Sequence, residues 1–94
     1  MNAKDLTLNI AVNLGRLARW VSEGKTARVG QFIEETDDYL DKLDKAARGE
    51  KFEKTYIAFK FNYGKLRENQ KFDDEWAEEA LTWSNILTHR ARFA

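Results

Sequence analysis

The 94-residue sequence contains no cysteine, no proline and a single histidine, His89. Without cysteine the chain has no disulfide bonds and no thiolate metal sites, which suits a reducing cytoplasm. One histidine leaves no Ser–His–Asp or Cys–His constellation to build, and no Glu precedes it by three residues as in the Glu-x-x-His motif of di-iron bundles. We therefore expect no enzyme activity, no catalytic residue, no metal ligand and no cofactor.

The sequence also lacks a net charge and a long apolar run. Its 16 basic and 16 acidic residues cancel, so the total charge indicates no partner, whereas a dedicated nucleic-acid binder more often carries a basic excess. No apolar run approaches the roughly 20 residues of a membrane span, and the first residues lack the pattern of a secretory signal. The expected protein is cytoplasmic and has no membrane partner.

What the sequence does contain is four stretches with apolar residues at helical spacing. The most regular one has intervals of four, three, four and three residues, which draw one stripe along an α-helix: Phe52, Tyr56, Phe59, Tyr63 and Leu66. The other stripes are Leu6, Ile10, Leu14, Leu17 and Val21, then Val29, Phe32, Ile33, Thr36, Leu40, Leu43 and Ala47, and finally Trp76, Ala80, Trp83 and Leu87. Short connections favour antiparallel neighbours, so we predict an all-α, up-down-up-down four-helix bundle. It forms a single domain over residues 1–94, with helices at 5–23, 27–47, 50–67 and 74–92.

Local signals mark the ends of these helices. Gly24 can adopt the left-handed conformation that ends the first helix, and Thr26 can cap the second. Gly49 is expected to stop the second helix, and Asp73 or Asp74 to cap the fourth.

Two alternatives stay open in the third stretch. Residues 57–63 alternate in polarity and could form an edge strand, and Gly64 could end or kink the helix early.

An acidic run on the second helix suggests a metal site of the kind that paired acidic motifs form in helical hydrolases. Glu34, Glu35 and Asp38 would supply one half of such a site, and Glu75 with Glu78 or Glu79 the other. On a helical wheel Glu34 and Asp38 fall on the side away from the core, although a metal cage in a bundle needs inward carboxylates. We interpret this run as a solvated face and keep the metal-dependent hydrolase as a minor alternative.

Two outward faces carry apolar residues where a monomeric bundle should be polar. The first comprises Lys54, Ile57, Phe61 and Lys65, and the second comprises Leu8, Val12, Arg16 and Arg19. Contiguous exposed apolar groups usually mark contact sites. We predict a partner-binding surface formed by Leu8, Val12, Lys54, Ile57, Phe61 and Lys65. The alternative is a wider core in which Leu8 or Ile57 packs against a neighbouring helix.

Basic residues near the first turn suggest a second kind of site. Arg16, Arg19, Lys25 and Arg28 form a corner that only Glu23 interrupts. Lysine and arginine neutralise phosphates, so this corner is a candidate nucleic-acid site, to which Lys60 and Arg67 are added.

Two segments carry a resemblance to a known family. Residues 25–32, followed by a long helix, are similar to the turn and basic helix of the small helical subunits of CRISPR interference complexes, and residues 59–67 resemble the aromatic and basic helix of the type III members. The resemblance covers roughly residues 10–90. It implies a non-catalytic subunit that stacks along an effector backbone and lines the path of guide and target. The contacts that it implies by position are Arg28, Lys60, Lys65 and Arg67.

The sequence therefore favours a small non-enzymatic interaction subunit that docks on protein partners. It favours a homodimer and a place in a larger complex equally. A stand-alone nucleic-acid-binding module is the alternative.

Overall fold

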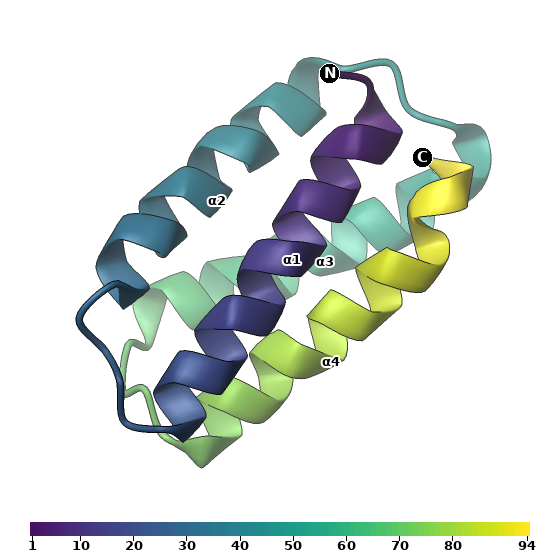
Figure 1. Cartoon of the computed structure of the whole chain (residues 1–94). Helices are drawn as coiled ribbons and strands as arrows, with labels where there is room; N and C mark the ends of the chain where they lie inside the picture. Colours follow the sequence, from purple (N-terminus) through teal and green to yellow (C-terminus); the bar gives the residue numbers. More distant parts are fainter.

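The structure, a computed structural model, describes all 94 residues and contains α-helices and no strand. The helices are α1 (Ala3–Ser22), α2 (Val29–Lys45), α3 (Glu53–Glu68) and α4 (Asp74–Arg90), with the short 3-10 helices η1 (Glu50–Phe52) and η2 (Ala91–Phe93). Successive helices run in opposite directions (Figure 1), as in an up-down-up-down bundle. The predicted all-α four-helix bundle is confirmed. The strand alternative for residues 57–63 is wrong, because they lie inside α3.

The core forms where the four stripes meet. Every stripe residue predicted for α1, α3 and α4 is buried. The stripe of α2 is buried only in part, since Phe32 and Leu40 lie at the margin and Ala47 lies beyond the end of the helix. None of the four helices combines the length and the apolar character that a membrane crossing requires.

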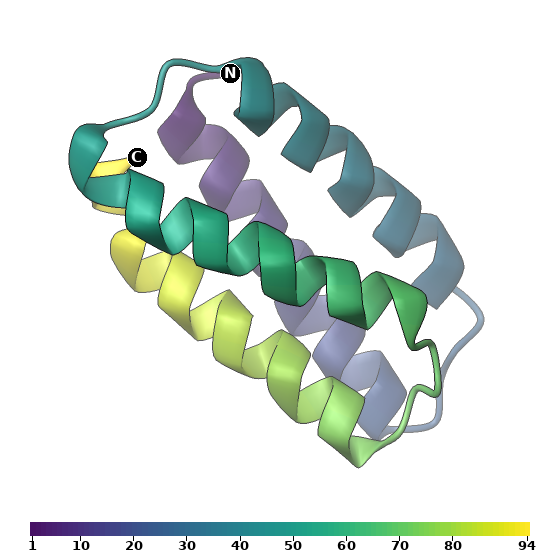
Figure 2. The same ribbon diagram turned by 180° about the vertical axis from the view of Figure 1, so that it is seen from behind.

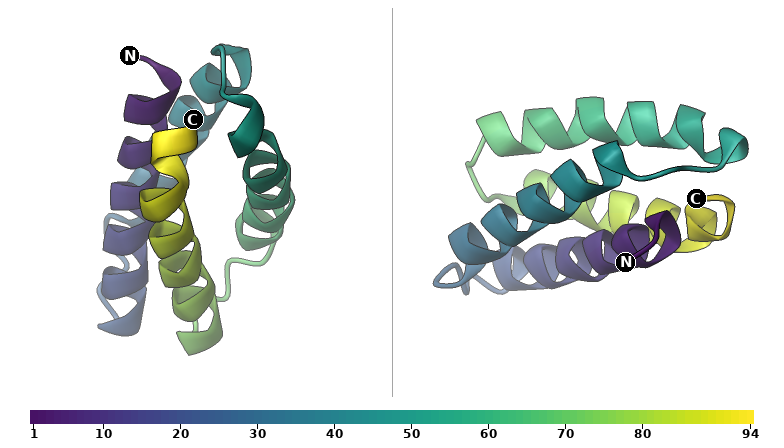
Figure 3. Two further views of the ribbon diagram at one scale, coloured as in Figure 1. Left: turned by 90° about the vertical axis from the view of Figure 1, so that its right-hand side faces the viewer. Right: turned by 90° about the horizontal axis from the view of Figure 1, so that it is seen from above.

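Helices α1 and α4 pack closely because their facing sides carry small residues. These residues are Ala11, Gly15 and Ala18 on α1, and Ala77, Ala80 and Ser84 on α4. A Cβ atom at Gly15 would lie 3.2 Å from the hydroxyl oxygen of Ser84, which donates a hydrogen bond of 2.7 Å to the carbonyl of Ala11. A helix surface without large side chains lets two backbones approach each other, which places α1 and α4 side by side (Figures 1 and 3).

Helix α3 lies across the bundle from α1, with α2 and α4 between them (Figures 2 and 3). Large side chains fill the space between α3 and the other helices, because its buried stripe begins with the fully buried Phe52 and continues through Tyr56, Phe59 and Tyr63. The ring of Phe59 lies 5.6 Å from that of Trp83 on α4 and 5.5 Å from that of Tyr63. The outer side of α3 therefore faces away from α1.

The predicted helix ends are correct in some places and wrong in others. Gly24 adopts the left-handed conformation (φ 71°), and the carboxylate of Asp73 accepts a hydrogen bond of 2.9 Å from the amide of Trp76. Thr26 does not cap α2: the capping position is Arg28, and α2 begins at Val29. Gly64 does not end α3, which continues to Glu68.

Gly49 has a different role from the predicted one. Helix α2 already ends at Lys45, where the backbone of Ala46 becomes extended. The amide of Gly49 donates a hydrogen bond of 2.7 Å to the carbonyl of Ala94, and a Cβ atom at this position would collide with the carbonyl oxygen of Phe93. Glycine is needed here because the backbone at η2 approaches the backbone of the connection that leads to α3.

Candidate docking faces

The outer side of α3 is the most exposed apolar surface of the protein. Successive helical residues are turned by about 100°, so burial of Tyr56, Phe59 and Tyr63 turns Ile57 and Phe61 outward. Their side chains are 64% and 65% exposed. With the exposed Lys54 and Lys65 they form the α3 face. The exposure predicted for these residues is confirmed, and their role in binding stays a prediction.

The two lysines of the α3 face have no carboxylate partner. Neither Lys54 nor Lys65 takes part in any of the ion pairs of the chain. The ammonium of Lys65 instead lies 4.5 Å from the centroid of the Phe61 ring, within the range of a cation–π interaction. The α3 face therefore combines an apolar strip with positive charge that is not neutralised within the chain.

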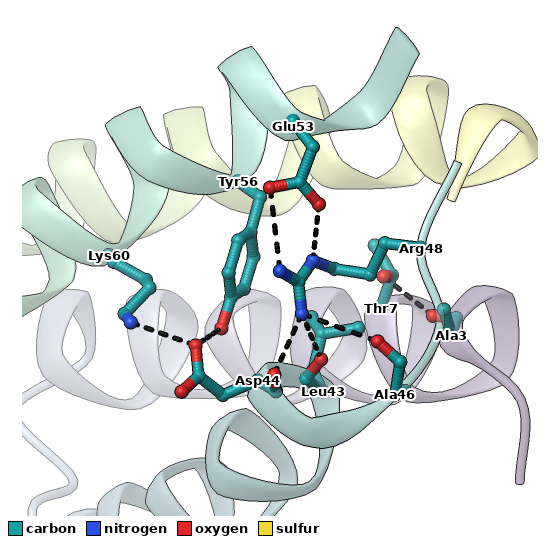
Figure 4. A network of polar contacts seen from close by, with 9 residues as sticks. All are labelled: Ala3, Thr7, Leu43, Asp44, Ala46, Arg48, Glu53, Tyr56 and Lys60. Atoms are coloured by element: carbon teal, nitrogen blue, oxygen red, sulfur yellow. Dashed lines mark hydrogen bonds and ion pairs between the residues drawn. The ribbon is translucent and has the colours of Figure 1, made fainter. Parts of the chain in front are cut away.

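Two clusters of polar residues hold α3 against α2. In the first, the Tyr56 hydroxyl donates to Asp44 Oδ1 at 2.5 Å, and Lys60 Nζ lies 2.9 Å from the same oxygen (Figure 4). Both donors stabilise the charged carboxylate, so the pKa of Asp44 lies below its usual value.

The second cluster repeats the first one two helical turns away. The Tyr63 hydroxyl lies 2.7 Å from Asp37 Oδ1, and Arg67 Nη2 lies 2.7 Å from Asp37 Oδ2. The two aspartates, the two tyrosines and the two cations are each seven residues apart, a spacing that returns to the same face of a helix. The sequence analysis did not predict these clusters, although the sequence contains the matching seven-residue spacing on both helices. Part of the acidic run of α2 thus has a structural function.

Arg48 anchors the connection between α2 and α3. Its Nη1 donates to the carbonyls of Leu43 and Asp44 at 2.8 and 2.9 Å, and its Nε lies 2.6 Å from Glu53 Oε1 (Figure 4). The hydrogen bond with Glu53 raises the pKa of Arg48. The guanidinium carbon also lies 4.2 Å from the centroid of the Tyr56 ring. One side chain therefore closes the end of α2 and fixes the start of α3.

The two tyrosine hydroxyls cause the stability of the protein to decrease at alkaline pH. Burial raises the pKa of Tyr63 and of Tyr56 above the usual value of 10.0, and the hydrogen bonds to aspartate raise both pKa values further. The folded protein keeps these protons at a pH where the unfolded chain releases them. The free energy of unfolding is therefore undiminished by these groups below about pH 10 and decreases as the pH rises beyond it.

We expect Tyr63→Phe to flatten this alkaline decrease, because the variant has one fewer group whose pKa rises on folding. The measurement is urea unfolding followed by circular dichroism at several values between about pH 8.5 and 11. The slope against pH is the readout, since loss of the hydrogen bond lowers stability at every pH. Equal slopes in the variant and the wild type would contradict the prediction.

The predicted partner-binding residues lie on two faces of the bundle. On α1, Val12 is 52% exposed and Leu8 is half-buried, so the wider-core alternative holds in part for Leu8 and is wrong for Ile57. Helices α1 and α3 lie on opposite sides of the bundle (Figure 3). The predicted set of six residues therefore divides into two separate faces.

The exposed apolar surface on the outer side of α1 extends onto α4. The sequence analysis did not predict this extension. Leu81 on α4 is 49% exposed and lines a shallow groove with Gly15 and Ala18. Arg19 and Glu78 lie in the two walls of this groove. Leu81 follows the buried Ala80 and lies outside the stripe, so an exposed apolar residue was detectable there.

The predicted nucleic-acid residues also divide. Arg16, Arg19, Lys25 and Arg28 are all exposed near the α1–α2 turn, and Arg16 lies 5.7 Å from the centroid of the Phe32 ring. Lys60 and Arg67 lie on α3, where they are paired with Asp44 and Asp37. Of the four contacts that the CRISPR-subunit resemblance implies, Lys60 and Arg67 are thus occupied within the chain, and Arg28 and Lys65 are free.

The acidic residues are spread over the surface. Glu34, Asp38 and Asp41 are exposed on the outer side of α2, and His89 is exposed in the last turn of α4. No three side chains of the His, Cys, Asp or Glu type converge on a point where they could hold a metal ion.

Comparison with known proteins adds no relative to this description. No protein-family model, curated protein or solved structure matches the chain. The resemblance to small CRISPR subunits stays a prediction.

Proposed function

We propose that the protein is a non-enzymatic helical interaction subunit whose α3 face binds an acidic amphipathic segment of another protein. The observation that carries this proposal is the exposure of Ile57 and Phe61, at 64% and 65%, next to each other on a helix whose opposite side is fully packed. Exposed apolar groups of this size on a rigid element are typical of contact sites.

The charge of the α3 face specifies the chemistry of the partner. Lys54 and Lys65 border the apolar strip and have no ion pair, whereas Lys60 and Arg67, on the side of α3 toward α2, are neutralised. A partner that covers Ile57 and Phe61 with apolar groups and places carboxylates beside the lysines satisfies both features of the face. An amphipathic helix provides such a pattern along one of its sides.

Neither α2 nor a second α3 face supplies this pattern. The exposed side of α2 is acidic, with Glu34, Asp38 and Asp41, but it presents no large exposed apolar residue. Two α3 faces packed on each other would bring lysines toward lysines. The proposal assigns the fitting segment to a different protein.

Selection from a displayed library of helices tests the proposal. The library consists of helices of about 20 residues with leucine at positions i, i+3, i+4 and i+7 and randomised flanking positions. We expect the selected helices to be enriched in Asp and Glu, because the face contributes two free lysines. We expect Ile57→Ser/Phe61→Ser to weaken their binding at least tenfold, as fluorescence anisotropy would report.

The matched control changes apolar residues on the other side of the bundle. Val12→Ser/Leu81→Ser also removes two exposed apolar side chains and should leave binding unchanged, since α1 and α3 lie on opposite sides (Figure 3). Both double variants should keep the circular dichroism spectrum of the wild type, because all four residues are exposed. The proposal fails if no helix is selected, if the selected helices are basic, or if the changes at Ile57 and Phe61 leave their binding intact.

A further inference from the structure

We infer that the outer side of α1 and α4 is the surface through which two copies of this chain associate. This α1–α4 face consists of Leu8, Val12 and Arg19 on α1 and of Glu78 and Leu81 on α4. It is directed away from α3 (Figure 3), so it is distinct from the α3 face, and it stands independently of the proposed function.

The antiparallel register of α1 and α4 places the apolar groups of this face together. Ser84 bonds to Ala11, and the groove contains Gly15 opposite Leu81 and Arg19 opposite Glu78. The same register brings Val12 one turn from Leu81 along the face. Val12 and Leu81 are about half exposed, and the groove beside them has a floor of small residues. Bulky side chains from a second surface can enter there.

The charges of the face are self-complementary. Arg19 on α1 and the carboxylates of Asp74 and Glu78 on α4 line the groove, and none of the three takes part in any of the ion pairs of the chain. A two-fold axis parallel to the helices lays α1 of one copy on α4 of the other at the same level. Arg19 then meets Glu78 of the second copy, and the reciprocal pair forms by symmetry.

A second pair of opposite charges extends this complementarity to the other end of the face. Asp5 in the first turn of α1 and Arg92 in η2 are both exposed, and η2 packs beside α1. Under the same two-fold axis, Asp5 of one copy lies at the level of Arg92 of the other. Opposite charges at both ends and apolar groups between them are what an isologous interface requires. The α3 face, with its two lysines, lacks this property.

The side of the bundle that carries this face is comparable in size to a typical dimer interface. The bundle measures 37 Å along the helices and 20 Å across, which gives one side of it an outline of about 740 Å². A typical specific interface buries about 800 Å² on each partner. A side covered along its whole length therefore approaches the usual size. In such a dimer both α3 faces stay exposed, directed away from each other.

Sedimentation velocity of the full chain between about 1 and 200 µM tests the inference. We expect a concentration-dependent shift toward twice the chain mass of 11.0 kDa. Val12→Glu/Leu81→Glu should weaken association at least tenfold, because it places carboxylates in the apolar centre of the interface. Ile57→Ser/Phe61→Ser, on the other side, should leave association unchanged. A chain that stays monomeric, or a dimer that only the second variant weakens, would overturn the inference.

Charge-reversal variants at Arg19 and Glu78 test the pairing of α1 of one copy with α4 of the other. Arg19→Glu alone and Glu78→Arg alone should each weaken association, because each brings two like charges together across the axis. The combined variant Arg19→Glu/Glu78→Arg should restore it. A combined variant no better than the single ones would refute this pairing of α1 with α4. All three variants alter exposed or groove-lining residues, so an unchanged circular dichroism spectrum serves as the folding control.

Discussion

Phe59→Ala is expected to lower the free energy of unfolding by about 3–5 kcal/mol, whereas Phe61→Ala should change it by less than about 0.5 kcal/mol. The two phenylalanines are two residues apart on α3, so they share a helix and differ in the direction of their side chains. Phe59 is fully buried, and Phe61 is 65% exposed.

The large effect at Phe59 has two causes. Its ring packs between those of Tyr63 and Trp83, at centroid distances of 5.5 and 5.6 Å, and it is removed completely from water. Truncation loses this burial and leaves a cavity that the neighbouring rings fill only in part. At Phe61 the same truncation removes a side chain that already contacts solvent.

Urea unfolding of the two variants and the wild type measures the difference. Phe59→Leu serves as a milder variant, with an expected loss of about 1–2 kcal/mol, in case the alanine variant does not fold. Similar losses at positions 59 and 61 would mean that Phe61 is covered in the folded state, which would contradict both the orientation of α3 and the proposed docking face.

The second large effect is expected at Arg48, where replacement by methionine should lower the free energy of unfolding by about 2–3 kcal/mol. The charged side chain satisfies the last carbonyls of α2, binds Glu53 through Nε and Nη2, and lies against the Tyr56 ring. Its side chain is only 16% exposed. Hydrogen bonds to charged groups contribute about 1.5–3 kcal/mol, and methionine keeps much of the packing while removing all of them.

Two further variants separate geometry from charge. Arg48→Lys should recover only part of the loss, because one ammonium cannot contact the carbonyls and both oxygens of Glu53 at once. Arg28→Met, at an exposed arginine without an ion pair, should be close to neutral. Full recovery with lysine would show that the positive charge alone is sufficient.

The number and the order of the helices were predictable from the sequence, and the reason is periodicity. The α3 stripe from Phe52 to Leu66 has only one regular structure that places all of its members on one side, and every member is buried. Gly24 and Asp73 were also predictable, because a left-handed conformation and a capping carboxylate are local properties. The start of α2 was not predicted correctly: Thr26 matches the capping preference, but the helix begins three residues later without a side-chain cap.

The partner-binding surface was predictable only in part. Exposure of Ile57 and Phe61 followed from the α3 stripe, because a residue opposite a buried stripe has nothing to pack against. The half-burial of Leu8 and the pairing of Lys60 and Arg67 did not follow, since both depend on residues from another helix. A charged residue on a helical wheel looks the same whether or not a partner approaches it.

By itself, the sequence determined that this protein is an all-α bundle, which side of each helix is buried, and that α3 presents apolar and basic groups outward. These are properties of a 3.6-residue period within one segment, and they do not require knowledge of the neighbours. Only the tertiary structure decided the relation between segments: α1 lies against α4 through small residues, α3 is fixed to α2 by Asp37 and Asp44, and the two predicted halves of the binding surface lie on opposite sides. Those relations depend on distances between residues far apart in the chain, which helical periodicity does not contain.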